Sequence, residues 1–135
     1  MILLDADFLS KLGISNDTKT LLVNPTKEFI EWEKISGGTS VFRDLNFLDE
    51  NVDVILFWPS SEKELSSMVP TLSNKLNDGG RLWIIIPRKE VALAINMDFG
   101  WEHVQKEGLK VGLVDNEQLK FDEDTYGTQF VFRKN

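Results

Sequence analysis

The sequence lacks the residues on which many catalytic and metal sites depend. It contains no cysteine and a single histidine, His103. Without cysteine, a disulfide framework, a thiolate zinc site and a cysteine nucleophile are all excluded. One histidine cannot form the clusters that bind transition metals, and no nucleophile or second imidazole accompanies it on its expected surface helix. The sequence therefore predicts no catalytic residue and no metal site.

Positive charge and long apolar runs are also scarce. The chain has 15 basic and 22 acidic residues, a formal net charge of −7. Such a surface repels phosphate backbones and anionic lipids, so neither nucleic acid nor membrane is an expected partner. No apolar run approaches the roughly 20 residues of a membrane-spanning helix, and Asp5 and Asp7 lie where a secretory signal needs positive charge. A cytoplasmic protein is expected.

Two apolar runs dominate the sequence that is present. Residues 52–58 and 82–86 are rich in β-branched and aromatic side chains, as in strands buried on both faces. Between them, Ser61 and Glu64 match a capping box that opens a helix, and Gly79-Gly80 is expected to end it. Pro70 lies inside this helix and predicts a kink or two abutting helices. The stretch is typical of a β-α-β unit.

The flanking segments complete an α/β pattern. Residues 5–12, 24–34 and 97–107 favour helices, the last one stopped by Gly108. Residues 20–24 and 39–42 favour strands, and 110–116 with 128–133 favour an antiparallel hairpin at one edge of the sheet. The prediction is a single three-layer Rossmann-like domain over residues 1–135, with a mostly parallel sheet and a C-terminal antiparallel hairpin.

Several of these segments resemble known families. Residues 41–57 resemble the stretch of class I S-adenosylmethionine-dependent methyltransferases that runs from the third strand into the fourth. Residues 75–87 resemble the Gly-Gly turn that leads into the fifth strand of the same superfamily. Residues 11–14, 22–25 and 87–89, with Tyr126 after its acidic run, resemble an uncharacterised family of short Rossmann-like domains of bacteria and archaea. The resemblance implies a truncated methyltransferase-like fold, and it leaves S-adenosylmethionine as a cofactor to be considered.

The expected cofactor loop departs from this pattern. Methyltransferases place glycines after the first strand, where backbone N–H groups approach the cofactor. This chain has Asn24-Pro25-Thr26-Lys27 there, and proline donates no N–H. The acidic residue expected after a second strand has no clear counterpart, and the distance from Asn24 to Thr39 leaves room for one helix only. The loop is therefore degenerate, and no cofactor is expected.

Ligands of open parallel sheets bind outside the carboxyl ends of the strands. Each candidate at that edge also has a purely structural interpretation: Asn24 as a helix cap, Trp58 as a core residue, Ser60 as a capping residue, and Arg88 with Lys89 as partners of surface acids. For Asp44, the resemblance implies a contact with an adenine amine. The acidic run 122–124 is a solvated loop, with a hard-cation site as the alternative. The candidate ligand-binding residues are Asn24, Asp44, Trp58, Ser60, Arg88 and Lys89.

Two functions remain open. The first hypothesis is a non-catalytic or regulatory interaction domain whose partner is another protein or a second copy of the chain. The alternative is a small S-adenosylmethionine-dependent methyltransferase, or another nucleotide- or anion-binding protein, that uses the carboxyl-end edge of the sheet.

Overall fold

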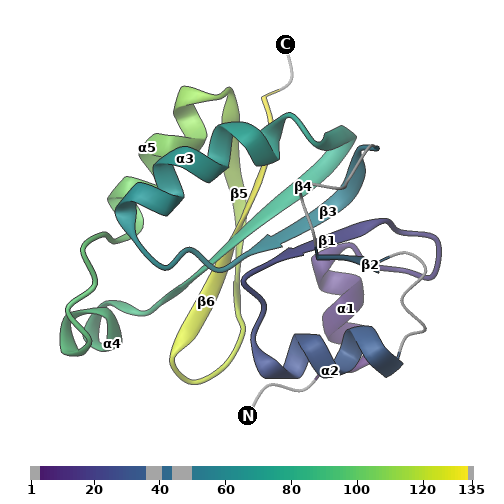
Figure 1. Ribbon diagram of the computed structural model, residues 1–135, viewed down its shortest axis with the longest axis horizontal. Helices are drawn as coiled ribbons and strands as arrows, with labels where there is room; N and C mark the ends of the chain where they lie inside the picture. Colours follow the sequence, from purple (N-terminus) through teal and green to yellow (C-terminus); the bar gives the residue numbers. More distant parts are fainter. Residues whose placement is uncertain (1–3, 36–40, 44–49, 134–135) are drawn as a thin grey trace.

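A computed structural model describes residues 4–35, 41–43 and 50–133. In these ranges the chain forms one mixed sheet with helices packed on both faces (Figure 1). The helices are α1 (Ala6–Leu12), α2 (Lys27–Ile35), α3 (Glu62–Ser73), α4 (Lys89–Ala94) and α5 (Trp101–Lys110). The strands are β1 (Thr20–Val23), β2 (Val41–Phe42), β3 (Val52–Phe57), β4 (Leu76–Pro87), β5 (Leu113–Lys120) and β6 (Thr125–Phe132).

The strand order is β2-β1-β3-β4-β6-β5. The first four strands are parallel, and β6 runs antiparallel to both β4 and β5. This confirms the predicted α/β sheet with its C-terminal hairpin. In doubly wound sheets of order 3-2-1-4-5-6, the place beside the first strand belongs to the second one. Here β2 occupies that place, and among the described residues no strand lies outside it.

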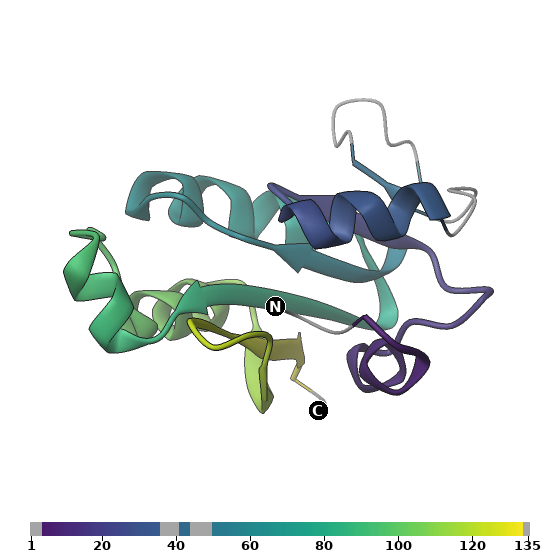
Figure 2. The same ribbon diagram turned by 90° about the horizontal axis from the view of Figure 1, so that it is seen from below.

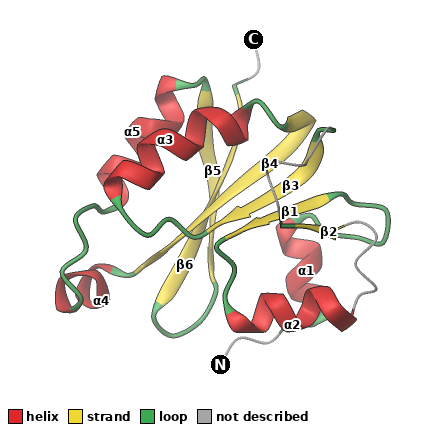
Figure 3. Cartoon of the chain, viewed as in Figure 1, coloured by secondary structure: helices red, strands yellow, loops and turns green. Residues whose placement is uncertain are grey.

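Side chains along the central strands point alternately to the two faces of the sheet, so the core has two parts, one on each face. Side chains of one parity, such as Ile55 and Ile84, pack with α3 and α5. Those of the other parity, such as Leu56 and Trp83, pack with α1 and α2. In Figure 3, α3 and α5 lie together at the upper left, and α1 and α2 lie together at the lower right. The result is the predicted three-layer arrangement.

Local signals explain most helix ends. Asp5 accepts a hydrogen bond from the Phe8 N–H at 2.8 Å, and Gly13 ends α1 with a φ of 91°. Ser61 accepts one from the Glu64 N–H at 3.1 Å, as the capping box predicts. Pro70 lies within a single helix, α3, so the alternative of two abutting helices is wrong.

Two predicted glycine stops are wrong. Gly79-Gly80 lies inside β4, at an irregularity in its pairing with β3, rather than at the end of α3. Gly108 lies inside α5, where a Cβ atom would be 2.7 Å from the Phe130 ring. Glycine serves there to bring the helix close to the sheet. The helix expected over 97–107 begins later, at Trp101, and the separate helix α4 was not predicted.

At the amino ends of the strands, Asp53 ties three elements together. Its carboxylate accepts hydrogen bonds from the Lys19 N–H at 3.0 Å and from Asn77 Nδ2 at 2.8 Å. The Lys19 hydrogen bond, followed by that of Asn77, holds the pKa of Asp53 below its ordinary value. The ionised carboxylate is therefore the form that the fold favours.

Asp53→Asn should lower the free energy of unfolding at pH 7 by about 1–3 kcal/mol, the range for hydrogen bonds to a charged group. Because the folded pKa is depressed, this stabilisation is present above the unfolded pKa of about 3.9 and is lost as pH falls through the folded pKa. Urea unfolding at pH 7 and at successively lower pH measures it, with Glu117→Gln as the control. A difference that persists unchanged at the lowest pH would contradict the assignment.

Candidate functional site

The chain reverses its winding direction between β1 and β3. From β1 it proceeds through α2 to β2 on one side, whereas β3 lies on the other side. Crevices at such points are the usual ligand sites of open α/β sheets. Here the point of reversal, called the crevice position or crevice below, lies between Asn24, which follows β1, and Trp58, which follows β3. A backbone hydrogen bond of 3.1 Å from the Trp58 N–H to the Val23 carbonyl joins the two strand ends.

Asn24 spans this crevice. Its Nδ2 donates to the Trp58 carbonyl at 3.2 Å and to Glu64 Oε1 at 2.9 Å. Its backbone has a φ of 58°, a left-handed conformation that asparagine tolerates better than most residues. The interpretation of Asn24 as the cap of α2 is wrong, because α2 begins only at Lys27. We call the two hydrogen bonds from Nδ2 the Asn24 bridge.

Glu64 is the residue at this edge that the sequence did not single out as a candidate. The same oxygen that accepts from Asn24 also accepts from the Ser60 N–H at 2.7 Å and from Ser60 Oγ at 2.9 Å. Burial raises the pKa of Glu64, but the hydrogen bonds from Asn24 and Ser60 outweigh it, so its pKa lies below the ordinary value. Ser61, and not Ser60, is the N-cap of α3, so the capping interpretation of Ser60 is wrong. Ser60 instead donates to the Glu64 carboxylate, which places a negative charge at the crevice.

A cavity of about 530 Å³ lies beside the crevice, at the carboxyl ends of β3 and β4. Four of its lining residues lie at the predicted edge: Trp58, Pro59, Ser60 and Pro87. Residues 95–98, after α4, form its opposite wall. Its size is within the range of small-molecule sites, about 300–1,000 Å³.

Trp58 belongs to both the core and the cavity. Its ring centroid lies 5.0 Å from that of Phe29 and 6.4 Å from that of Phe121. The indole is half-buried and also lines the cavity. Trp58 thus packs against the core, and its ligand contact stays a prediction.

Arg88 and Lys89 make different contacts. Arg88 Nε donates to the Glu123 carbonyl at 3.1 Å, and its Nη1 pairs with Glu90 at 2.9 Å. The Arg88 N–H also donates to the Asp124 carbonyl at 2.8 Å, so this residue fastens the β5–β6 turn to the start of α4. Lys89 instead borders a second, neighbouring cavity. Asp44 lies outside the described residues.

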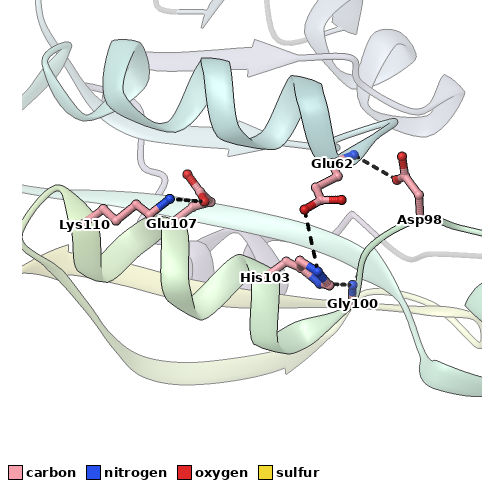
Figure 4. A network of polar contacts seen from close by, with 6 residues as sticks. All are labelled: Glu62, Asp98, Gly100, His103, Glu107 and Lys110. Atoms are coloured by element: carbon pink, nitrogen blue, oxygen red, sulfur yellow. Dashed lines mark hydrogen bonds and ion pairs between the residues drawn. The ribbon is translucent and has the colours of Figure 1, made fainter.

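The remaining polar candidates have structural contacts. His103 Nδ1 accepts from the Gly100 N–H at 3.1 Å, and its Nε2 lies 3.7 Å from Glu62 Oε1 (Figure 4). Asp122 closes the acidic turn by accepting from the Asp124 and Thr125 N–H groups. Within the described ranges, no three His, Cys, Asp or Glu side chains are grouped to hold a metal ion. The helices of these ranges are also too short or too polar to cross a membrane.

Solved structures share this architecture. Magnesium protoporphyrin IX methyltransferase from Synechocystis, solved with bound SAH, aligns at a TM-score of 0.67 and 10% identity, covering 94% of this chain and 80% of that one. The chain has a methyltransferase-like Rossmann fold. The glycopeptide N-methyltransferase MtfA with sinefungin aligns at 0.64 and 10% identity, covering 94% and 91% of the two chains. The N-methyltransferase NodS from Bradyrhizobium japonicum aligns at 0.59 and 16% identity, covering 84% and 73%.

These likenesses concern the fold. No protein-family model matches the sequence, and no curated protein matches it. The predicted methyltransferase-like scaffold is therefore confirmed by its shape, while the chemistry of its edge has to be judged from the side chains described above.

Asn24→Gly tests the Asn24 bridge without straining the backbone, because glycine adopts a positive φ freely. Loss of the two hydrogen bonds should lower the free energy of unfolding by about 1–2 kcal/mol. Asn96→Gly is the matched control: Asn96 has the same φ of 58°, and no side-chain hydrogen bond to it is found in the described part of the chain. Urea unfolding measures both variants. Equal effects would show that the bridge contributes no stability.

Proposed function

We propose that the chain is a non-catalytic domain of methyltransferase-like fold that acts as a regulatory or interaction module. The observation that supports this most directly is the Asn24 bridge across the crevice at the winding reversal. The side chains that would have to admit a cofactor there are instead bonded to one another, and Glu64 has three donors on one oxygen.

The chemistry of the crevice also disfavours the cofactor. S-adenosylmethionine carries an amino-acid tail with a carboxylate, which needs N–H donors or positive charge nearby. Pro25 supplies no N–H, and the ionised Glu64 would repel the tail carboxylate. The partner of such a module would be another protein or a second copy of the chain.

One observation favours a second candidate. The cavity beside Trp58 and Ser60 is large enough for a small molecule, and solved structures of the same fold contain the cofactor or its product, such as Aeropyrum pernix fibrillarin with S-adenosyl-L-methionine. A small methyltransferase, or another nucleotide- or anion-binding protein, would use this cavity and leave the Asn24 bridge intact.

S-adenosylmethionine and its demethylated product at about 1 mM should leave the melting temperature unchanged and give no heat in titration calorimetry. A ligand present at 100 times its Kd would add about 2.7 kcal/mol of stability, which a thermal melt detects as a shift of several degrees. Such a shift, combined with methyl transfer to an acceptor, would overturn the non-catalytic assignment and support the second candidate.

The partner is tested separately. Light scattering after size exclusion reports self-association, and quantitative affinity capture of the full chain reports other proteins. We expect one of the two to detect a complex. Monomeric behaviour with no specific capture, together with cofactor turnover, would contradict the proposal.

A further inference from the structure

A second cavity, of about 340 Å³, lies between α4, α5 and the adjoining ends of β4 and β6. It shares Pro87, Met97 and Asp98 with the first cavity, but the Asn24 bridge contributes nothing to it. Figures 1 and 2 show α4 at the margin of the molecule. No residue of α4 is buried, so this helix forms a wall of the cavity without belonging to the core.

The lining is mainly apolar and aromatic. Ile86 and Phe99 are buried, whereas Trp101 and Tyr126 are half-buried and present ring surface to the cavity. Leu93 also lines it and is 69% exposed. Cavities of this size and composition, with a few polar groups at the rim, are typical of small-molecule sites.

The charged groups at the rim determine the sign of the charge that a ligand should carry. Two carboxylates, Asp98 and Glu102, face one ammonium, Lys89. His103 Nδ1 accepts the Gly100 N–H at 3.1 Å, so this ring nitrogen is already occupied by a backbone donor (Figure 4). The lining is therefore net negative, on a chain that is itself acidic.

Two aromatic rings of the lining also favour a positively charged ligand. Burial raises the pKa of the Tyr126 hydroxyl, and the charge of Glu102 raises it further. The phenol is thus neutral, and the field of Glu102 reaches it. The rings of Tyr126 and Trp101 attract cations through their negative faces. Asp98 is held in place, since its Oδ1 accepts from the Glu62 N–H at 2.9 Å.

We propose that this cavity binds a small organic amine: an ammonium head between Glu102 and the rings of Trp101 and Tyr126, and an apolar body along Met97, Ala92 and Leu93. The site does not include the Asn24 bridge, so this proposal does not rest on the proposed function.

Three probes with the same apolar body separate the ligand classes: phenethylamine, 2-phenylethanol and 3-phenylpropionate. In two-dimensional NMR titrations of the full chain, phenethylamine should shift the Trp101 indole signal and the backbone signals of residues 97–103. An exposed cation–π contact and an exposed ion pair together predict binding about five- to tenfold tighter than that of the other two probes.

Two exposed positions test the assignment without disturbing the core. Glu102→Gln should weaken phenethylamine about three- to fivefold and leave 2-phenylethanol unchanged, whereas Glu117→Gln, on β5, should change neither. Leu93→Lys should weaken the amine and strengthen 3-phenylpropionate. Circular dichroism confirms that each variant is folded.

Three outcomes would overturn the proposal. Equal or tighter binding of 3-phenylpropionate would show an anion site at Lys89 instead. Amine binding that Glu102→Gln leaves unchanged, or shifts confined to residues that do not line the cavity, would place the amine elsewhere. No shift with any probe at several millimolar would show that the cavity does not take this class of ligand.

Discussion

The ligand edge of this domain depends on one amide group. Asn24 Nδ2 connects the end of β1 to the end of β3 and to the first turn of α3. Three elements that are far apart in the chain are thereby fixed at the point where an open α/β sheet would otherwise have a crevice. The left-handed backbone of Asn24 is what aims the amide across the gap. The same residue that follows β1 thus also joins β3 and α3 at this edge.

The open space near this edge lies beside the Asn24 bridge. Both cavities border the segment that contains α4 and residues 95–98, and this segment buries little of itself. At one end Arg88 contacts the β5–β6 turn, and at the other Asp98 contacts the start of α3. The two cavities therefore share a wall that is hydrogen-bonded to the rest of the domain at both ends and exposed between them.

Much of the fold could be predicted from local sequence. The apolar runs of β3 and β4 lie fully inside the sheet, and Asp5, Gly13 and Ser61 mark helix ends as their chemistry requires. The glycines misled the prediction, because the missing side chain of glycine serves both to end helices and to let two elements pack closely. Gly108 brings α5 onto Phe130, a contact that only the tertiary structure defines. α4 has no buried face, so it left no periodic apolar signal.

The site was less accessible to sequence analysis. Trp58, Ser60 and Lys89 do line cavities, because strand ends of a parallel sheet meet at one edge. Glu64 appeared as the partner in a capping box, a local role. Its contact with Asn24, 40 positions away, depends on the strand order, which local patterns do not specify. For the same reason, nothing in the sequence distinguished Arg88, which contacts the β5–β6 turn, from Lys89, which lines a cavity.

The position of β6 has a consequence for how the domain is made. This strand follows β5 in the chain but lies between β4 and β5, and β5 pairs with no other described strand. During synthesis on a ribosome, the apolar edge of β4 must therefore stay unpaired until residues 125–132 have emerged. Nascent chains of this protein would present an unpaired strand edge from the emergence of residues 76–87 until that of residues 125–132, which is the kind of surface that chaperones shield.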